Sequence, residues 1–267
     1  MRFRIFFIVV AFLGFSFAGA ADSVAAEKLT GRSILEEQNK RHVSDNESGE
    51  MAMTLIDRKG KESQRKVKAY HLKKDDKSKI LIQFLEPANI SGTGLLTWEQ
   101  TEGKEDDQWL YLPASRAVKR IAGGGKKNQF MGTDLSYEDL QFEDLDRHKY
   151  TLMGEETLSG QKCWKIEAVP TENEKKNTGY GKRIMYVDQG NYFQLKIDYY
   201  DNSGRHIKTA LFEDIRPEKG QMHRPYKVTM TRIRKKTSTI IITTKIDLET
   251  PTKDATFTQN YMKRPVK

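Results

Sequence analysis

The residues that decide the fold lie between positions 92 and 140. They read GTGLLTWEQ at 92–100, DDQWLYLPASRAVKRI at 106–121 and GGGKKNQFMGTDLSYEDL at 123–140. In the first two blocks, aromatic and aliphatic residues alternate with polar ones, as they do in half-buried strands. The third block joins three consecutive glycines to a short helix-like turn at 133–141. This region therefore predicts closely spaced strands followed by a flexible glycine loop and a turn of helix.

These blocks, taken in order, resemble the outer-membrane lipoprotein-sorting proteins, which are relatives of the periplasmic lipoprotein carrier. The resemblance continues to the C-terminus, and the pieces that carry it are GTGLLTW at 92–98, DQWLYLPASRAVKRI at 107–121, FMGTDLSYEDL at 130–140 and GQMHRPYKVTMTR at 220–232. It implies an incomplete antiparallel barrel over a helical lid, with a LolA-like hydrophobic cavity for acyl chains and no catalytic chemistry. It also implies a periplasmic location and service to inner-membrane lipid exporters of the RND (resistance-nodulation-division) type.

Alternating residues recur through the rest of the chain and predict about ten or eleven strands. The short spacings between them require neighbouring strands to be antiparallel. One amphipathic helix is predicted at 27–42, with Ser33 and Glu36 as a capping box. We therefore expect a mainly β fold, in which a single strongly curved antiparallel sheet forms an incomplete or half barrel covered by two or three short helices. Such a sheet leaves a concave apolar face, and hydrophobic ligands bind in clefts of this kind.

Residues 1–20 have the pattern of a signal peptide. Arg2 and Arg4 precede an apolar run at 5–17, and the run ends in an A-x-A cleavage site at 18–20. Cleavage after Ala26 is the alternative. We expect the mature chain to be exported in soluble form to the periplasm and to fold as a single lipid-binding domain at 27–267.

Composition narrows the function classes further. The chain has 267 residues, of which 37% are hydrophobic and 31% charged, so it is less apolar than a thick compact core requires. Its net charge of +9 is spread over nearly every strand and turn. We expect a solvated basic surface with weak, transient attraction to anionic membrane head groups, and export excludes nucleic acid as a partner. The only cysteine, Cys163, lies in a strand pattern and is interpreted as structural.

The apolar positions of the strands are the candidate lining of an acyl-chain cavity. Alternation places Phe193, Leu195, Ile197 and Tyr199 on one face of a strand. The predicted ligand-binding set is completed by Leu96, Trp98, Trp109, Tyr111, Met131, Leu135, Trp164, Ile184, Tyr186, Val228 and Met230. Three basic residues beside this wall are predicted to contact a head group or a partner, namely Arg116, Lys119 and Arg120.

No catalytic, cofactor or metal site is predicted. The glycines at 123–125 match neither a phosphate loop nor a dinucleotide fingerprint. The five histidines form no metal-ligand motif, and no serine lies in a nucleophile elbow. The acidic residues around the helix-like turn are interpreted as the solvated side of a helix, and they are Asp134, Glu138, Asp139, Glu143, Asp144 and Asp146.

These observations predict a non-enzymatic, monomeric periplasmic carrier that moves the acyl chains of lipids or lipoproteins between the inner and outer membranes. The alternative is an accessory subunit of an RND-type exporter, which docks through its apolar face and holds no cargo of its own. Carriers of the family hold their lid closed with an arginine that bonds to lid backbone. Its counterpart is not singled out, and Arg65, Arg116 and Arg120 remain alternatives.

Overall fold

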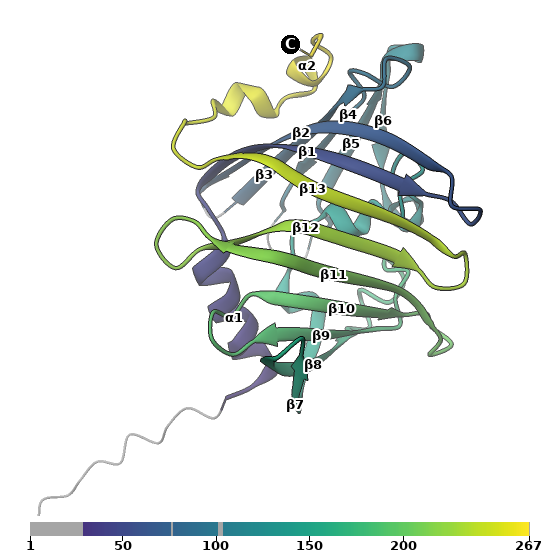
Figure 1. The fold of residues 1–267 in the computed structure, drawn as a ribbon. Helices are drawn as coiled ribbons and strands as arrows, with labels where there is room; N and C mark the ends of the chain where they lie inside the picture. Colours follow the sequence, from purple (N-terminus) through teal and green to yellow (C-terminus); the bar gives the residue numbers. More distant parts are fainter. Residues whose placement is uncertain (1–28, 76, 101–103, 267) are drawn as a thin grey trace, which may run out of the picture.

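The computed structural model describes residues 29–75, 77–100 and 104–266. The predicted signal peptide at 1–20 and its alternative cut after Ala26 lie outside the described residues. Thirteen antiparallel strands form one strongly curved sheet that is not closed into a barrel (Figure 1). This confirms the predicted fold class. The strands outnumber the ten or eleven expected.

Strands make up most of the described chain. They are β1 Asn46–Ile56, β2 Glu62–Lys74, β3 Lys77–Glu86, β4 Gly94–Trp98, β5 Asp107–Leu112, β6 Ala117–Ile121, β7 His148–Leu158, β8 Gln161–Pro170, β9 Lys182–Asp188, β10 Gln194–Tyr200, β11 His206–Pro217, β12 His223–Arg232 and β13 Thr237–Asp247. The helical elements are α1 Gly31–His42 and α2 Gln259–Met262, with short 3-10 turns η1 Pro113–Ser115, η2 Gly123–Lys127, η3 Glu138–Leu140, η4 Leu145–Arg147 and η5 Asp254–Phe257.

The strand order explains how the concave face is covered. Across the sheet it runs β6-β5-β4-β3-β2-β1-β13-β12-β11-β10-β9-β8-β7. β6 and β7 follow each other in the chain, yet they form the two opposite edges of the sheet. Residues 122–147, called the crossing segment below, therefore run from one edge to the other inside the curve (Figure 1). The face that carries α1 and the crossing segment is called the inner face.

The helix-like turn predicted at 133–141 is mostly not helical. Only Glu138–Leu140 forms a turn of 3-10 helix. Upstream of it the backbone folds back on itself, because Phe130 N–H donates to the carbonyl of Leu135 (2.8 Å) and Gln129 bridges Ser136. Backbone groups paired in this way are not available to an α-helix.

Helix α1 forms where an amphipathic helix was predicted, but its cap differs. Thr30 is the N-cap residue and exchanges hydrogen bonds with Ser33, whose hydroxyl accepts from Thr30 N–H (2.9 Å). Glu36, the expected partner in the box, instead accepts from Arg32 (2.8 Å). Ile34 and Leu35 are fully buried and seal one end of the inner face. Each such side chain contributes roughly 1.5–3 kcal/mol through burial.

Apolar clusters lie on both faces of the sheet. The inner face has two, and the crossing segment contributes Leu135 to one and Phe130 to the other. On the outer face, Phe257 and Met262 of the C-terminal segment cover β3 to β5, with α2 outside the curve (Figure 1). Gly94 makes this close approach possible, because a Cβ there would lie only 2.5 Å from Met262 Cγ.

Candidate functional site

An open apolar cavity of about 440 Å³ lies on the inner face, where β1, β2, β3, β12 and β13 run side by side. We call it the apolar groove. Its apolar lining consists of Val43, Met51, Ala69, Ile80, Ile82, Phe142, Pro225, Val228, Ile241 and Ile246. Most of these side chains are only partly buried, and Val43 is 41% exposed. Partly exposed aliphatic side chains that share one concavity are the usual lining of a site for a hydrophobic ligand.

Most of the titratable groups beside the groove are paired or neutral, and the exception is Lys245, which also lines it. Glu47 and Arg224 form an ion pair (2.6 Å), and Arg224 also donates to the carbonyl of His42 (2.8 Å). Burial lowers the pKa of both His42 and His71 to about 4, so both rings are uncharged at neutral pH. The groove therefore presents an apolar wall, and Lys245 is the one charged lining residue without an ion pair among those described.

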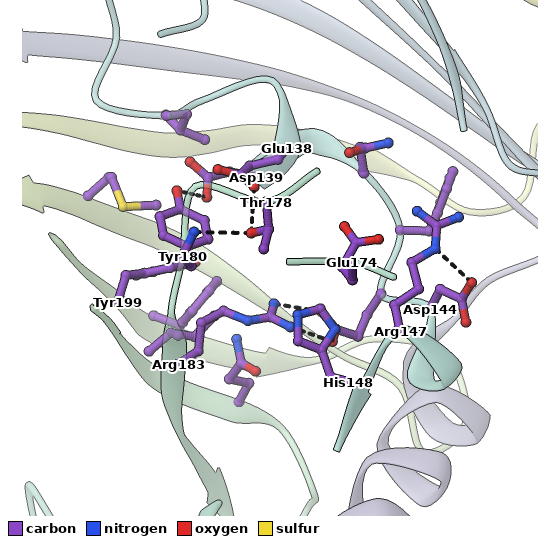
Figure 2. Close-up of a pocket in the computed structure, with 18 of the residues that line it drawn as sticks. Glu138, Asp139, Asp144, Arg147, His148, Glu174, Thr178, Tyr180, Arg183 and Tyr199 are labelled. Atoms are coloured by element: carbon purple, nitrogen blue, oxygen red, sulfur yellow. Dashed lines mark hydrogen bonds and ion pairs between the residues drawn. The ribbon is translucent and has the colours of Figure 1, made fainter. Parts of the chain in front are cut away.

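A second cavity of about 270 Å³ adjoins the groove and has a different character. We call it the charged cavity. Figure 2 shows its titratable side chains, which include Arg183 and His148 on one side and Tyr180, Glu138 and Asp139 on another. Its floor is apolar and consists of Leu135, Ile197, Tyr199, Phe212, Val228 and Met230.

Glu143 and Arg183 form the central ion pair of the charged cavity. Both terminal nitrogens of Arg183 donate to the Glu143 carboxylate at 2.7 Å, and the Tyr150 hydroxyl donates to the same carboxylate. Burial alone would raise the pKa of Glu143, but the Arg183 guanidinium outweighs it and lowers that pKa to about 2. The pair is ionised throughout the physiological pH range.

The acidic residues of the crossing segment fasten it to the sheet. Asp139 accepts from Lys208 on β11 (2.5 Å) and from the Tyr180 hydroxyl (2.8 Å). Burial lowers the pKa of the Lys208 ammonium, while Asp139 opposes that shift. Glu138 accepts from the Thr178 hydroxyl (2.9 Å) and Gly179 N–H (3.1 Å).

Asp134 extends this fastening to the middle of the sheet. Its carboxylate accepts from the hydroxyls of Thr237 (2.5 Å) and Thr239 (3.0 Å), both on β13. Asp144 and Asp146 lie at the far end, where they pair with Arg147 (2.9 Å) and Arg32 (2.8 Å). The interpretation of these acids as the solvated side of a helix is wrong, because most of them bond to partners on other elements.

Part of the predicted ligand-binding set gathers on the inner face. The residues that line the charged cavity are Leu135, Ile197, Tyr199, Val228 and Met230, and Val228 lines the apolar groove as well. Trp164 belongs to the same inner cluster, and Met131 packs against the other one. The Phe193 ring lies beside His42 (5.1 Å) and Phe212 (6.4 Å), each of which lines one of the two cavities.

The rest of the set lies on the outer face. Leu96, Trp98, Trp109 and Tyr111 cluster with the C-terminal segment, and Trp98 Nε1–H donates to the carbonyl of Phe257 (2.9 Å). These four side chains therefore do not line either cavity. Strand β4 is buried on both faces, since Leu95 is buried on the inner face and its neighbour Leu96 on the outer face. Alternation alone does not tell which face is concave.

A bulge corrects the expectation that positions 193–199 share one face. The β9–β10 register shifts between Gln194 and Lys196, and Leu195 joins an outer cluster while Ile197 points inward. One inserted residue reverses the side on which later residues of a strand lie. The same outer cluster contains the other predicted lining residues of β9, together with the buried cysteine, and these are Ile184, Tyr186 and Cys163.

The predicted head-group contacts lie away from both cavities. Arg116 sits in the β5–β6 hairpin with a positive φ of 51°, and Lys119 is exposed on the edge strand β6. Arg120 pairs with Asp107 (2.5 Å) and is 63% exposed. None of the three lines the apolar groove or the charged cavity.

Sequence reasoning missed the lining of the groove itself. Met51, Ala69 and His71 lie on β1 and β2, where alternating residues predicted strands. That alternation carried no signal for a cavity, because the groove exists only where β13 joins β1. The sheet order, and not the strand pattern, brings Thr243 opposite Met51.

Comparisons with known proteins identify the family. A crystal structure from Vibrio parahaemolyticus, described as a candidate outer membrane lipoprotein-sorting protein domain, is 31% identical. The match covers 88% of this chain and 98% of that one, with a TM-score of 0.82. The chain belongs to the outer-membrane lipoprotein-sorting family. A family model described as that of an uncharacterized-like protein matches residues 76–264.

Two further structures agree with this placement. A DUF1329 family protein from Desulfovibrio piger is 30% identical, covers 87% of this chain and 97% of its own, and has a TM-score of 0.82. A LolA superfamily protein from Nitrosomonas europaea is 19% identical, covers 88% and 100%, and has a TM-score of 0.68, which shows the shared fold. No curated protein sequence matches significantly.

Several charged groups of this site bond to partners on other elements, as Glu143 does to Arg183 on β9. Within residues 29–75, 77–100 and 104–266, no three His, Cys, Asp or Glu side chains are grouped to hold a metal ion. Over the same residues, no helix has the length and apolar character needed to cross a membrane. What the arrangement offers is an apolar groove whose neighbouring charges, apart from Lys245, are paired.

Proposed function

We propose that this member of the lipoprotein-sorting family is a non-enzymatic carrier, which binds the acyl chains of a lipid or lipoprotein in the apolar groove. The observation that carries the proposal is the groove itself, an open cavity of about 440 Å³ whose aliphatic lining is left partly exposed. Exposed apolar patches that share a concavity mark ligand or partner sites. Glu47 and Arg224 are paired and His42 and His71 are neutral, so these four groups place no unpaired charge beside a chain lying there.

The energy available suits a carrier. A lipid chain gains about 0.8 kcal/mol for each methylene that it buries. A chain of sixteen carbons held along the groove would gain on the order of 10 kcal/mol. That gain is similar to what the chain loses on leaving a bilayer, so transfer in either direction would be close to balanced.

The setting that we propose is the periplasm, with transfer between the inner and outer membranes. The signal-peptide pattern at 1–20 and the likeness to lipoprotein-sorting proteins support it. The carrier would act as a monomer, and its basic surface would favour brief contact with anionic head groups. An RND-type exporter of the inner membrane is the proposed source of cargo, and copurification with such an exporter tests this part.

The decisive experiment is gentle purification of the mature chain from its own envelope, followed by native mass spectrometry and lipid extraction. A bound acyl lipid at one per chain is expected. Ile80→Asp, which places a charge in the groove, should abolish retention, whereas Ile242→Asp on the exposed outer side of β13 should retain the lipid. A lipid-free mass together with no uptake from vesicles would refute the carrier and favour the partner-docking role.

A further inference from the structure

Phe142 separates the apolar groove from the charged cavity. It is the only residue of the crossing segment that lines the groove, and the two cavities share just Phe142 and Val228 among the residues that line them. Val228 belongs to β12 and forms floor on both sides. The Phe142 ring lies 5.6 Å from the His71 ring on β2.

We propose that Phe142 determines how long an acyl chain the groove accepts. The proposal rests on the proposed carrier function and assigns a specificity-determining residue to that same site. A chain that enters the groove and lies along the inner face meets the Phe142 ring where the groove ends. The ring stops the chain there, and the methylenes beyond that point remain outside the protein.

The backbone around Phe142 is held on both sides. Gln141 Nε2 donates to the Asp106 carboxylate (3.2 Å), and Asp106 is itself buried. Glu143 is fixed by the two 2.7 Å bonds from Arg183. Because both neighbours are anchored to other elements, the Phe142 side chain is presented to the groove in a defined place. A ring on a loose loop would yield to a longer chain, and this one has no such freedom.

The space behind Phe142 is suited to an extension of the chain. The charged cavity adds about 270 Å³, and its floor continues the groove with Ile197, Phe212 and Met230. Within that cavity Glu143 pairs with Arg183 and Asp144 pairs with Arg147. Removing the aromatic ring therefore opens the apolar floor while Glu143, the neighbour of Phe142, keeps its counter-charge.

The test measures the chain-length preference of purified, delipidated protein for saturated fatty acids from decanoate to stearate. We expect wild-type affinity to rise with length and then reach a plateau. In Phe142→Ala the plateau should move to longer acids, with affinity rising about fourfold for each further methylene buried, which is the equivalent of about 0.8 kcal/mol. Phe142→Leu, which preserves packing volume better, should move it by a smaller step and guards against a folding defect in the alanine variant.

Ile80→Ala is the matched control. It enlarges the groove without joining the two cavities, because Ile80 lines the groove alone. Its affinity should fall for every acid, with the plateau at the wild-type length. An unchanged plateau in both Phe142 variants, with normal wild-type binding, would overturn the role of Phe142 and leave the carrier intact. Failure of wild-type protein to bind any acid would overturn both.

Discussion

The apolar groove and the charged cavity lie next to each other on one sheet, yet the crossing segment contributes very different numbers of lining residues to them. Eight of its residues line the charged cavity, whereas Phe142 alone lines the groove. Over the charged cavity, buried acids such as Asp139 and Glu143 fasten the segment to β11 and β9. The charged cavity therefore lies under a fastened stretch of the segment, whereas the groove beside it receives only Phe142 from that segment.

The comparison indicates that buried ion pairs and apolar contacts serve different purposes in this fold. Ion pairs in the charged cavity fix the position of a covering segment, because each needs exact partners. The groove needs no exact partners, because apolar contacts are non-directional and tolerate ligands of varying shape. Changes in the charged cavity should therefore act mainly on stability, and changes in the groove mainly on binding.

The largest expected effect comes from breaking the central ion pair. Arg183→Ala leaves the partly buried Glu143 carboxylate without its counter-charge, which costs up to about 3–5 kcal/mol of unfolding free energy. Urea denaturation followed by circular dichroism measures this loss. Arg120→Ala, at the exposed pair with Asp107, is the control and should cost no more than about 1 kcal/mol. Equal costs for the two variants would contradict an anchoring role for the buried pair.

The next effect is a dependence of stability on acid pH. Burial lowers the pKa of His71 in the groove and of His148 in the charged cavity to about 4. The unfolded chain takes up protons near pH 6.5 and the folded chain does not, so unfolding free energy falls as pH drops from 6.5 towards 4. Each histidine contributes up to about 1.4 kcal/mol per pH unit in this window.

Substituting these histidines separates the two cavities. His71→Phe and His148→Phe should each make the fall in stability with acid shallower, as urea denaturation at several pH values would show. Only His71→Phe should also alter fatty-acid affinity, because His71 lines the groove and contacts Phe142. If unfolding free energy fell with pH in both variants as steeply as in the wild type, these two rings would have the same pKa in the folded and unfolded chain.

The smallest expected effect on stability belongs to the groove wall. Met51 is partly exposed there, so Met51→Ala should lower unfolding free energy by roughly 1 kcal/mol, less than a fully buried Met→Ala substitution costs. Fatty-acid affinity should nevertheless fall several-fold, since the ligand loses methylene contacts. Isothermal titration and urea denaturation on the same sample give both numbers. A large loss of stability with unchanged affinity would reverse the assignment of roles.

Strand patterns predicted the sheet well and its faces poorly. Alternation located the strands and the helix at 27–42, because these depend on local residue order. Alternation did not show which of Leu95 and Leu96 faces inward, because both are buried. Leu96 is buried on the outer face by the C-terminal segment. Alternation also missed the bulge at Leu195, where one unpaired residue changes the side on which later residues lie.

The candidate site depended on features that no local pattern carries. The groove forms only when β13 joins β1, and the crossing segment is defined by the positions of β6 and β7 at opposite edges. The carboxylates Asp139 and Glu143 are residue types typical of a helix surface, and their buried partners lie far away in the chain, at Lys208 and Arg183. The sequence shows which residues are charged, but it does not show which of them form ion pairs.

The pairing of β1 with β13 has a consequence for the folding rate. Ser48 pairs with Asp247, so the middle of the sheet is complete only when β13, the last strand in the chain, has paired with β1, the first. Contacts between residues so distant in sequence give a high contact order, and proteins of this kind fold in milliseconds to seconds and not in microseconds. Until β13 arrives, β1 has an unpaired edge that is open to other extended chains. A chain cut short before residue 237 would lack this strand entirely, and we expect it to aggregate while its remaining hairpins form.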